Sequence, residues 1–193
     1  MSTELTPTAD FYYTQVTSAL RSVAQEKIDK VIDLIVKSVI SDQRIWIAGN
    51  GGSSATASHF AADLMRPGQQ EKYWVKAISL SESTPRVTAI GNDFSYEEVF
   101  GRQIKSLASS NDLLVLLSAS GNSPNLIRCL RTANEMKVLT LSLVGFQGGV
   151  LKAESQHCLH FPTDSGAYEV AEDAHSIMCH YIAMMVRARL ETV

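Results

Sequence analysis

The sequence predicts an α/β fold in which a parallel sheet of five strands lies between layers of helices, preceded by a helical N-terminal arm. Short apolar runs typical of buried strands alternate along the chain with longer amphipathic segments typical of helices. Strands that alternate with helices pair in parallel and are covered on both faces. The length of 193 residues and the hydrophobic content of 45% suit one such domain with its own core.

We expect this single domain to span residues 1–193, with the arm at 1–41 and the α/β core at 42–193. Apolar positions recur at helical spacing over residues 9–40, which predicts one or two amphipathic helices in the arm. The expected strands of the core are residues 44–48, 74–80, 112–117, 137–143 and 156–161. The expected helices are residues 53–65, 96–107, 124–136 and 169–190, with a short helix or turn at Gly148 and Gly149.

The composition argues against several classes of protein. The net charge of -3 disfavours a general nucleic-acid-binding protein. No apolar run approaches the ~18 residues that a membrane span requires, and residues 1–7 lack the basic and apolar regions of a signal peptide. Cys129, Cys158 and Cys179 show no CxxC spacing, so neither a disulfide framework nor a zinc–thiolate site is expected. We therefore expect a cytoplasmic protein that binds neither nucleic acid nor membrane.

A glycine- and serine-rich turn, GNGGSS, follows the first expected strand at residues 49–54. Gly51 and Gly52 let the backbone approach an anion closely, and Ser53 can donate a hydrogen bond from the start of the next helix. The spacing matches neither the dinucleotide-binding pattern nor the P-loop, so no nucleotide cofactor is expected. An ordinary strand–helix turn with a serine cap would have the same composition.

A second polar turn, SASGNS, follows the third expected strand at residues 118–123. The hydroxyls of Ser118, Ser120 and Ser123, together with backbone N–H groups, can bind a phosphate monoester without lysine or arginine. Both turns follow strands of a parallel sheet, so they belong at the edge where such folds bind ligands. Each turn alone is ambiguous, and the two together favour an anionic ligand.

Two helices carry titratable pairs that could perform chemistry. His59 and Asp63 are four residues apart and share a helix face, as a catalytic pair, half of a metal site or a plain surface pair would. Glu172 and His180 lie along one stripe of the last, largely apolar helix, where ionisable groups are solvated, paired or functional.

The combination of these motifs resembles the phosphoheptose isomerases, which are of the SIS (sugar isomerase) type. The resemblance covers nearly the whole chain and includes, in order, the GNGGSS turn, SHFAADL at 58–64, IGNDF at 90–94, the SASGNS turn, Gly148 with Gly149, and the last helix. It implies a three-layer SIS fold and a homotetramer with active sites at subunit interfaces. It also implies an aldose–ketose isomerase that interconverts sedoheptulose 7-phosphate and D-glycero-D-manno-heptose 7-phosphate through an enediolate.

Carried over position by position, the resemblance implies catalytic roles for Asp63 and His180. The substrate contacts that it implies are Asn50, Gly51, Gly52, Ser53, Asp93, Ser118, Ser120, Ser123 and Glu172. Some members bind zinc through the positions of His59, Asp63, Glu172 and His180. A zinc site and a metal-free site are therefore both open.

Two departures from the family pattern leave the substrate open. Asp63 stands where the family has glutamate, and a carboxylate set back by ~1 Å can cost ~100-fold in rate. Glu172 stands where glutamine is common, and substrate length also depends on the loop at residues 66–73. One alternative is an SIS isomerase for another sugar phosphate. Another is a non-catalytic SIS adaptor of the replication-initiator-associating type, which would need neither Asp63 nor His180.

Overall fold

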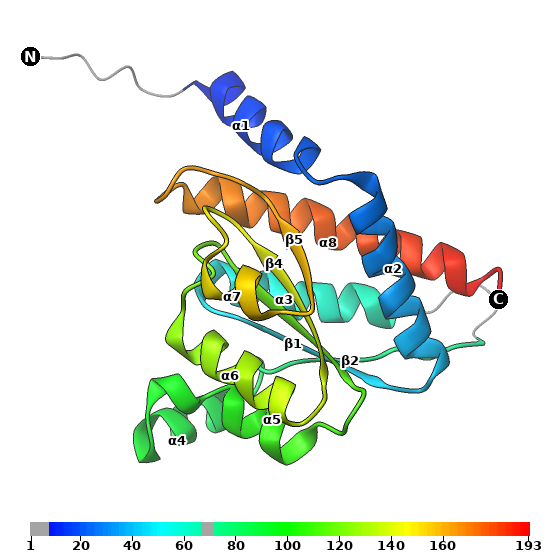
Figure 1. The fold of residues 1–193 in the computed structure, drawn as a ribbon, viewed down its shortest axis with the longest axis vertical. Helices are drawn as coiled ribbons and strands as arrows, with labels where there is room; N and C mark the ends of the chain where they lie inside the picture. Colours follow the sequence, from blue (N-terminus) through cyan, green and yellow to red (C-terminus); the bar gives the residue numbers. More distant parts are fainter. Residues whose placement is uncertain (1–7, 67–71) are drawn as a thin grey trace, which may run out of the picture.

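The computed structural model describes residues 8–66 and 72–193 and has three layers, helices–sheet–helices (Figure 1). The central sheet has five parallel strands in the order β2-β1-β3-β4-β5. Their bounds are β1 (Arg44–Gly49), β2 (Lys76–Ser79), β3 (Leu113–Ser118), β4 (Leu139–Val144) and β5 (His157–His160). The predicted parallel sheet is confirmed. Residues 1–7, where no signal peptide was expected, and most of the loop at residues 66–73 lie outside the described residues.

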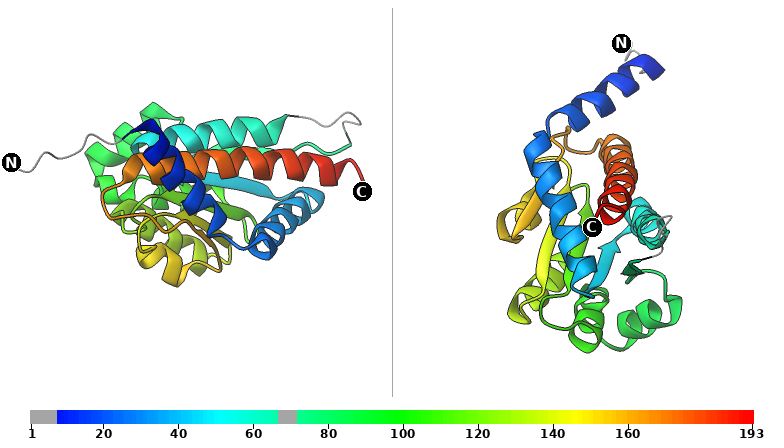
Figure 2. Two further views of the ribbon diagram at one scale, coloured as in Figure 1. Left: turned by 90° about the horizontal axis from the view of Figure 1, so that it is seen from above. Right: turned by 90° about the vertical axis from the view of Figure 1, so that its right-hand side faces the viewer.

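The helices cover both faces of the sheet. The first face is covered by α2 (Gln25–Ile40), α3 (Gly51–Met65) and α8 (Tyr168–Leu190). The second face is covered by α5 (Gly101–Leu107), α6 (Pro124–Glu135) and α7 (Gly149–Glu154). The first helix of the arm, α1 (Ala9–Arg21), extends away from the body and reaches it mainly through α8 (Figure 2).

The strand sequences explain this layering. Ile45 and Ile47 of β1 pack toward α2, α3 and α8, whereas Trp46 and Ala48 pack toward α5 and α6. Successive side chains of a strand point to opposite faces, so a strand that is covered on both sides is apolar at every position. The five residues 113–117 of β3 are all fully buried. The runs of apolar residues that predicted these strands are therefore the centre of the core.

Two helical segments differ from the expectation. The segment 96–107 is not one helix: a 3₁₀ turn (Tyr96–Glu98) is followed by Val99 and Phe100, which both insert into the core, and then by α5. The helix α4 (Thr84–Asp93) was not predicted. None of its residues is fully buried, and only Val87 and Ile90 pack partly against the core, so its apolar pattern is too short to identify a helix.

The strand order places a topological switch point between β1 and β3. From β1 the chain passes outward to β2 on one side and later returns to β3 on the other. The connections after β1 and β3 therefore diverge, which opens a crevice at the carboxyl ends of these two strands. The GNGGSS and SASGNS turns both lie there.

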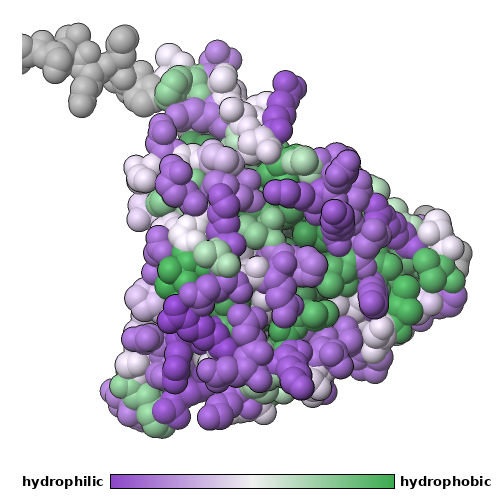
Figure 3. Space-filling view, viewed as in Figure 1, coloured by the Kyte–Doolittle hydropathy of each residue, from purple (hydrophilic) through white to green (hydrophobic). Residues whose placement is uncertain are grey.

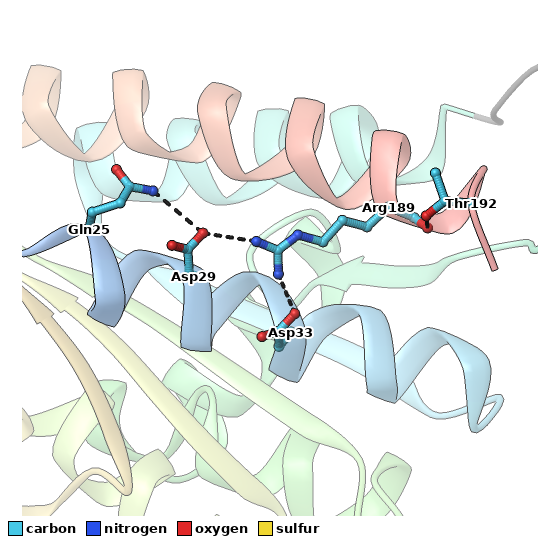
Figure 4. Close-up of polar contacts among 5 residues, drawn as sticks. All are labelled: Gln25, Asp29, Asp33, Arg189 and Thr192. Carbon is cyan, nitrogen blue, oxygen red and sulfur yellow. Dashed lines mark hydrogen bonds and ion pairs between the residues drawn. The ribbon is translucent and has the colours of Figure 1, made fainter.

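Polar contacts tie both ends of α8 to the arm. Near its start, Tyr12 of α1 donates a hydrogen bond of 2.6 Å to Asp173. Near its end, Arg189 donates to Asp29, at 2.8 Å, and to Asp33 on α2 (Figure 4). No helix among residues 8–66 and 72–193 is both long and apolar enough to cross a membrane.

Candidate functional site

A cavity of about 90 Å³ lies at the switch point between β1 and β3. It brings together six of the side chains expected to contact substrate, from β1, α3, β3, α6 and α8. Its lining residues are Asn50, Ser53, Leu117, Ser118, Ala119, Ser120, Ser123, Leu126, Tyr168 and Glu172. Glu172 is the only one that carries a charge, so ligand recognition here depends on hydroxyl and amide groups.

The serines of the SASGNS turn are arranged to donate. The Oγ of Ser118 accepts a hydrogen bond from the backbone N–H of Gly121 at 3.0 Å, and the Oγ of Ser120 accepts one from Asn122 at 3.2 Å. A hydroxyl that accepts such a bond keeps its own hydrogen free for a ligand. Ser123 directly precedes α6, and its side chain makes no capping bond. An anion with several oxygens matches these three donors.

The backbone of this turn is held by the segment that leads into α7. Gly121 has a φ of +67°, and a Cβ at this position would overlap the carbonyl of Gly148. Its own carbonyl accepts a bond of 3.0 Å from the N–H of Leu151, and the Oδ1 of Asn122 accepts one of 3.0 Å from Val150. The turn therefore keeps its shape without a ligand.

Glu172 reaches across from α8 to the first turn of α3. Its carboxylate lies against Gly52, in the space that a Cβ at residue 52 would occupy. A carboxylate is favoured beside a helix N-terminus. This end of α3 is therefore already occupied by an anion, so the serine turn is the better place for the phosphate group of a ligand.

A second cluster lies farther along the same two helices. The Nε2 atoms of His59 and His180 each lie 3.6 Å from Oδ2 of Asp63. The two imidazole rings meet edge to face at 4.8 Å between centroids. The Asp63 side chain is 17% exposed and those of His59 and His180 are 57% and 51% exposed, so both histidines are open to solvent or to a partner.

The cluster fits a metal ion such as zinc. Its three ligand atoms lie within 4.8 Å of one another, and two imidazoles with one carboxylate form a donor set that zinc prefers. Three protein ligands with an open fourth position are typical of catalytic zinc. The structure thus brings together three of the four expected ligands, while Glu172 stays at the cavity.

Three expected substrate contacts do not line the cavity: Asp93, Gly51 and Gly52, the last of which lies against Glu172. Asp93 ends α4, is exposed and accepts a 3.0 Å hydrogen bond from Asn92, and it is not one of the residues that line the cavity. Gly51 begins α3 with a φ of +54°, so its role is to form the turn. Three residues near the site were not predicted: Tyr168, Asn125 and Tyr96. Tyr168 precedes Glu172 by four residues, a spacing that could have revealed it.

Burial separates His175 from the other histidines. It is 1% exposed, and its ring meets that of Phe161 at 5.3 Å. Removal from water lowers the pKa of His175 to about 4, and only the backbone of Val144 opposes the shift. Desolvation also raises the pKa of the thiol of Cys179, with Asp63 adding to the effect. Both groups therefore stay neutral at physiological pH.

Comparison with known proteins gives a consistent result. The SIS domain family matches residues 11–145. Phosphoheptose isomerase from Helicobacter pylori strain P12 is 38% identical over 158 residues, which cover 82% of this chain and 81% of that protein. Phosphoheptose isomerase 1 of Campylobacter jejuni is 35% identical over 164 residues, covering 85% and 87%. The structure of phosphoheptose isomerase from Neisseria gonorrhoeae superposes with a TM-score of 0.82 at 28% identity, covering 94% of this chain and 96% of that one. The chain therefore belongs to the SIS domain family and, within it, to the phosphoheptose isomerases.

Proposed function

We propose that this protein is a sugar-phosphate isomerase that interconverts sedoheptulose 7-phosphate and D-glycero-D-manno-heptose 7-phosphate. The observation that carries the proposal is the pairing of a small cavity, lined mainly by hydroxyl and amide groups, with a carboxylate–imidazole cluster along one pair of helices. The names of the relatives, phosphoheptose isomerases, support a heptose phosphate as the class of substrate. An adaptor protein would need neither the cavity nor the cluster.

The substrate phosphate binds at the serine turn in this proposal. Ser118, Ser120 and Ser123 donate to its oxygens, and Ser53 and Asn50 add donors from the opposite side of the cavity. The carboxylate of Glu172 accepts hydrogen bonds from sugar hydroxyls. Anchoring at the phosphate provides binding energy far from the reacting carbons, and this energy positions them.

Proton transfer is assigned to Asp63 and His180. Isomerisation moves one proton between C1 and C2 of the open sugar and another between the two oxygens. A carboxylate and an imidazole 3.6 Å apart can divide these duties, since histidine both accepts and releases protons near neutral pH. The direction of the reaction decides which group acts first as the base.

We also propose that His59, Asp63 and His180 bind a zinc ion. A bound zinc ion would polarise the sugar oxygens and stabilise negative charge on them. A carboxylate that ligates the ion is not a free base, so the metal content decides between the two uses of Asp63.

We propose further that the chain assembles as a homotetramer in a reducing compartment such as the cytoplasm. Ile177 and Met184, which are 46% and 53% exposed, flank His180 on α8, and α1 exposes Phe11 and Tyr13. Figure 3 shows hydrophobic patches exposed on a face that is otherwise largely hydrophilic. A second copy would cover such groups, and closed symmetry is usual for soluble homo-oligomers. All three cysteines are unpaired, which fits reducing conditions.

The test is a screen of seven-, six- and five-carbon ketose phosphates by NMR in heavy water, with and without chelator. Sedoheptulose 7-phosphate should isomerise and incorporate deuterium at C1 or C2. Exchange only with a shorter sugar would identify an isomerase for another substrate. The absence of exchange with every sugar would favour the adaptor. Light scattering on the same sample reports the mass, and a monomer at micromolar concentration would contradict the tetramer.

A further inference from the structure

We infer that Asn125 and Tyr96 are positioning residues that hold the amide of Asn50 in one orientation toward the ligand. This inference rests on the proposed function, because it concerns how the same cavity presents a donor. It is carried by three hydrogen bonds that converge on Asn50. Neither Asn125 nor Tyr96 lines the cavity itself.

The two asparagines form a reciprocal amide pair. Nδ2 of Asn50 donates to Oδ1 of Asn125 at 2.9 Å, and Nδ2 of Asn125 donates to Oδ1 of Asn50 at 2.9 Å. Asn125 is 2% exposed, and a buried amide is costly unless it is paired. The pair also joins the GNGGSS turn to the start of α6, so both turns of the site keep a fixed separation.

Tyr96 completes the arrangement from the 3₁₀ turn after α4. Its hydroxyl donates to Oδ1 of Asn50 at 2.9 Å. Oδ1 of Asn50 then accepts two bonds, one for each lone pair, while Nδ2 uses one of its two hydrogens. The second N–H has no partner among the described residues. With its carbonyl side saturated, Asn50 is left as a donor of one N–H to the cavity that it lines.

The position of Asn50 in the fold supports this interpretation. Asn50 precedes the first residue of α3, with φ -114° and ψ 153°, where an asparagine side chain commonly caps the helix. Here its side chain makes no capping bond. The amide is directed instead to Asn125 and Tyr96. A donor whose orientation is set before the ligand binds stabilises an oxygen without reorganisation.

The decisive experiment is a double-mutant cycle between Tyr96→Phe and Asn50→Ala. The Tyr96 side chain is exposed, so the loss of its hydroxyl leaves the fold intact, and thermal unfolding verifies this. Tyr96→Phe should lower kcat/KM for sedoheptulose 7-phosphate and raise the Kd by roughly threefold to tenfold, as expected for one hydrogen bond. In the Asn50→Ala background, Tyr96→Phe should change kcat/KM and Kd by less than about 1.5-fold, because the oxygen that accepts the Tyr96 hydrogen bond is absent.

Thr88→Val is the matched control, since it also removes one exposed hydroxyl, which bonds to the backbone of its own helix α4. It should match wild type. Asn125→Leu, which is close in size and leaves no polar atom of its own unpaired, should lower affinity at least as much as Tyr96→Phe and have little further effect once Asn50 is alanine.

The outcomes separate this inference from the proposed function. If calorimetry shows that the sugar phosphate binds but no turnover is detected, the proposed isomerase activity is wrong. The double-mutant cycle can still be evaluated in that case from the Kd values. If the sugar phosphate does not bind, inorganic phosphate is used as the probe. The inference is overturned if Tyr96→Phe equals wild type in affinity and turnover, or if its effect is the same with and without the Asn50 side chain.

Discussion

Oδ2 of Asp63 lies 3.6 Å from Nε2 of His180, and this contact joins α3 to α8. Asp63→Asn and His180→Gln keep the size of each group and remove its proton transfer. Each change should lower kcat by about 10²–10⁴-fold while leaving the affinity for a phosphate ligand nearly intact. Asp63→Asn should also slow deuterium incorporation into the sugar.

His157→Gln is the control for His180→Gln, because His157 lies on β5, outside the cluster. Steady-state kinetics on the confirmed substrate provide the measurement. Wild-type turnover in His180→Gln would show that His180 does not transfer protons, even in an active isomerase.

The serine turn gives a prediction about binding. Ser120→Ala and Ser123→Ala each remove a donor to a charged phosphate, which is worth ~1.5–3 kcal/mol, so KM should rise by about 10-fold or more. Ser109→Ala is the matched control, because Ser109 precedes β3 at the opposite edge of the sheet. If both turn variants stay within twofold of wild type, the turn is only structural.

Metal content is a direct test of the histidine–aspartate cluster. Purified protein should carry close to one equivalent of zinc per chain by elemental analysis, and His59→Ala should lose it, since one of three ligands is removed. His157→Ala should retain the metal. Full activity in protein shown to be metal-free would remove zinc from the mechanism.

The contact between Glu172 and Gly52 predicts a steric effect. Gly52→Ala should displace the Glu172 carboxylate from the start of α3 and lower kcat/KM by about tenfold or more, because the carboxylate no longer faces the sugar. Adding Glu172→Ala to Gly52→Ala should cause little further loss. Gly91→Ala is the control, since its Cβ would make only an ordinary contact with Val99. Equal kinetics for the Gly52 and Gly91 variants would contradict the role of this contact.

Buried His175 predicts a pH dependence of stability. Its pKa is about 4 in the folded chain, below the ordinary value near 6.5, so between these values the unfolded chain takes up a proton that the folded chain does not. Stability should be complete above about pH 6.5 and fall toward pH 4, by up to roughly 3 kcal/mol. His175→Leu should flatten this slope in denaturant unfolding measured across the window, and His157→Gln should not. An unchanged slope in His175→Leu would assign the acid sensitivity to other groups.

The sequence predicted the sheet well because its signals are local. Continuous apolar runs such as 113–117 have one good solution, a strand buried on both faces, and a glycine-rich turn after a strand has a fixed place in a parallel sheet. It failed at α4, whose residues are all at least partly exposed and whose apolar signal is limited to Val87 and Ile90.

The site was only partly predictable, because side-chain direction depends on packing. The positions of His59, Asp63 and His180 on their helices could be read from spacing, and the structure brings them together. Glu172 turns toward the first turn of α3 because Gly52 leaves space there, which no spacing along α8 reveals. Asn125 likewise meets Asn50 only through the order of β1 and β3 in the sheet.

The attachment of α8 at both of its ends has a practical consequence for how this protein can be cut or fused. The expected division into an arm at 1–41 and a core at 42–193 would suggest that the arm can be removed. Removal would break the hydrogen bonds that Tyr12 and Asp29 make with α8, the helix that carries Glu172 and His180. It would also expose the face of the sheet that α2 covers with buried side chains such as Ile32. Deletion variants that start at residue 42 should therefore be insoluble or inactive. An affinity tag should therefore be attached ahead of Thr8, the residue that caps α1, so that the whole arm is kept.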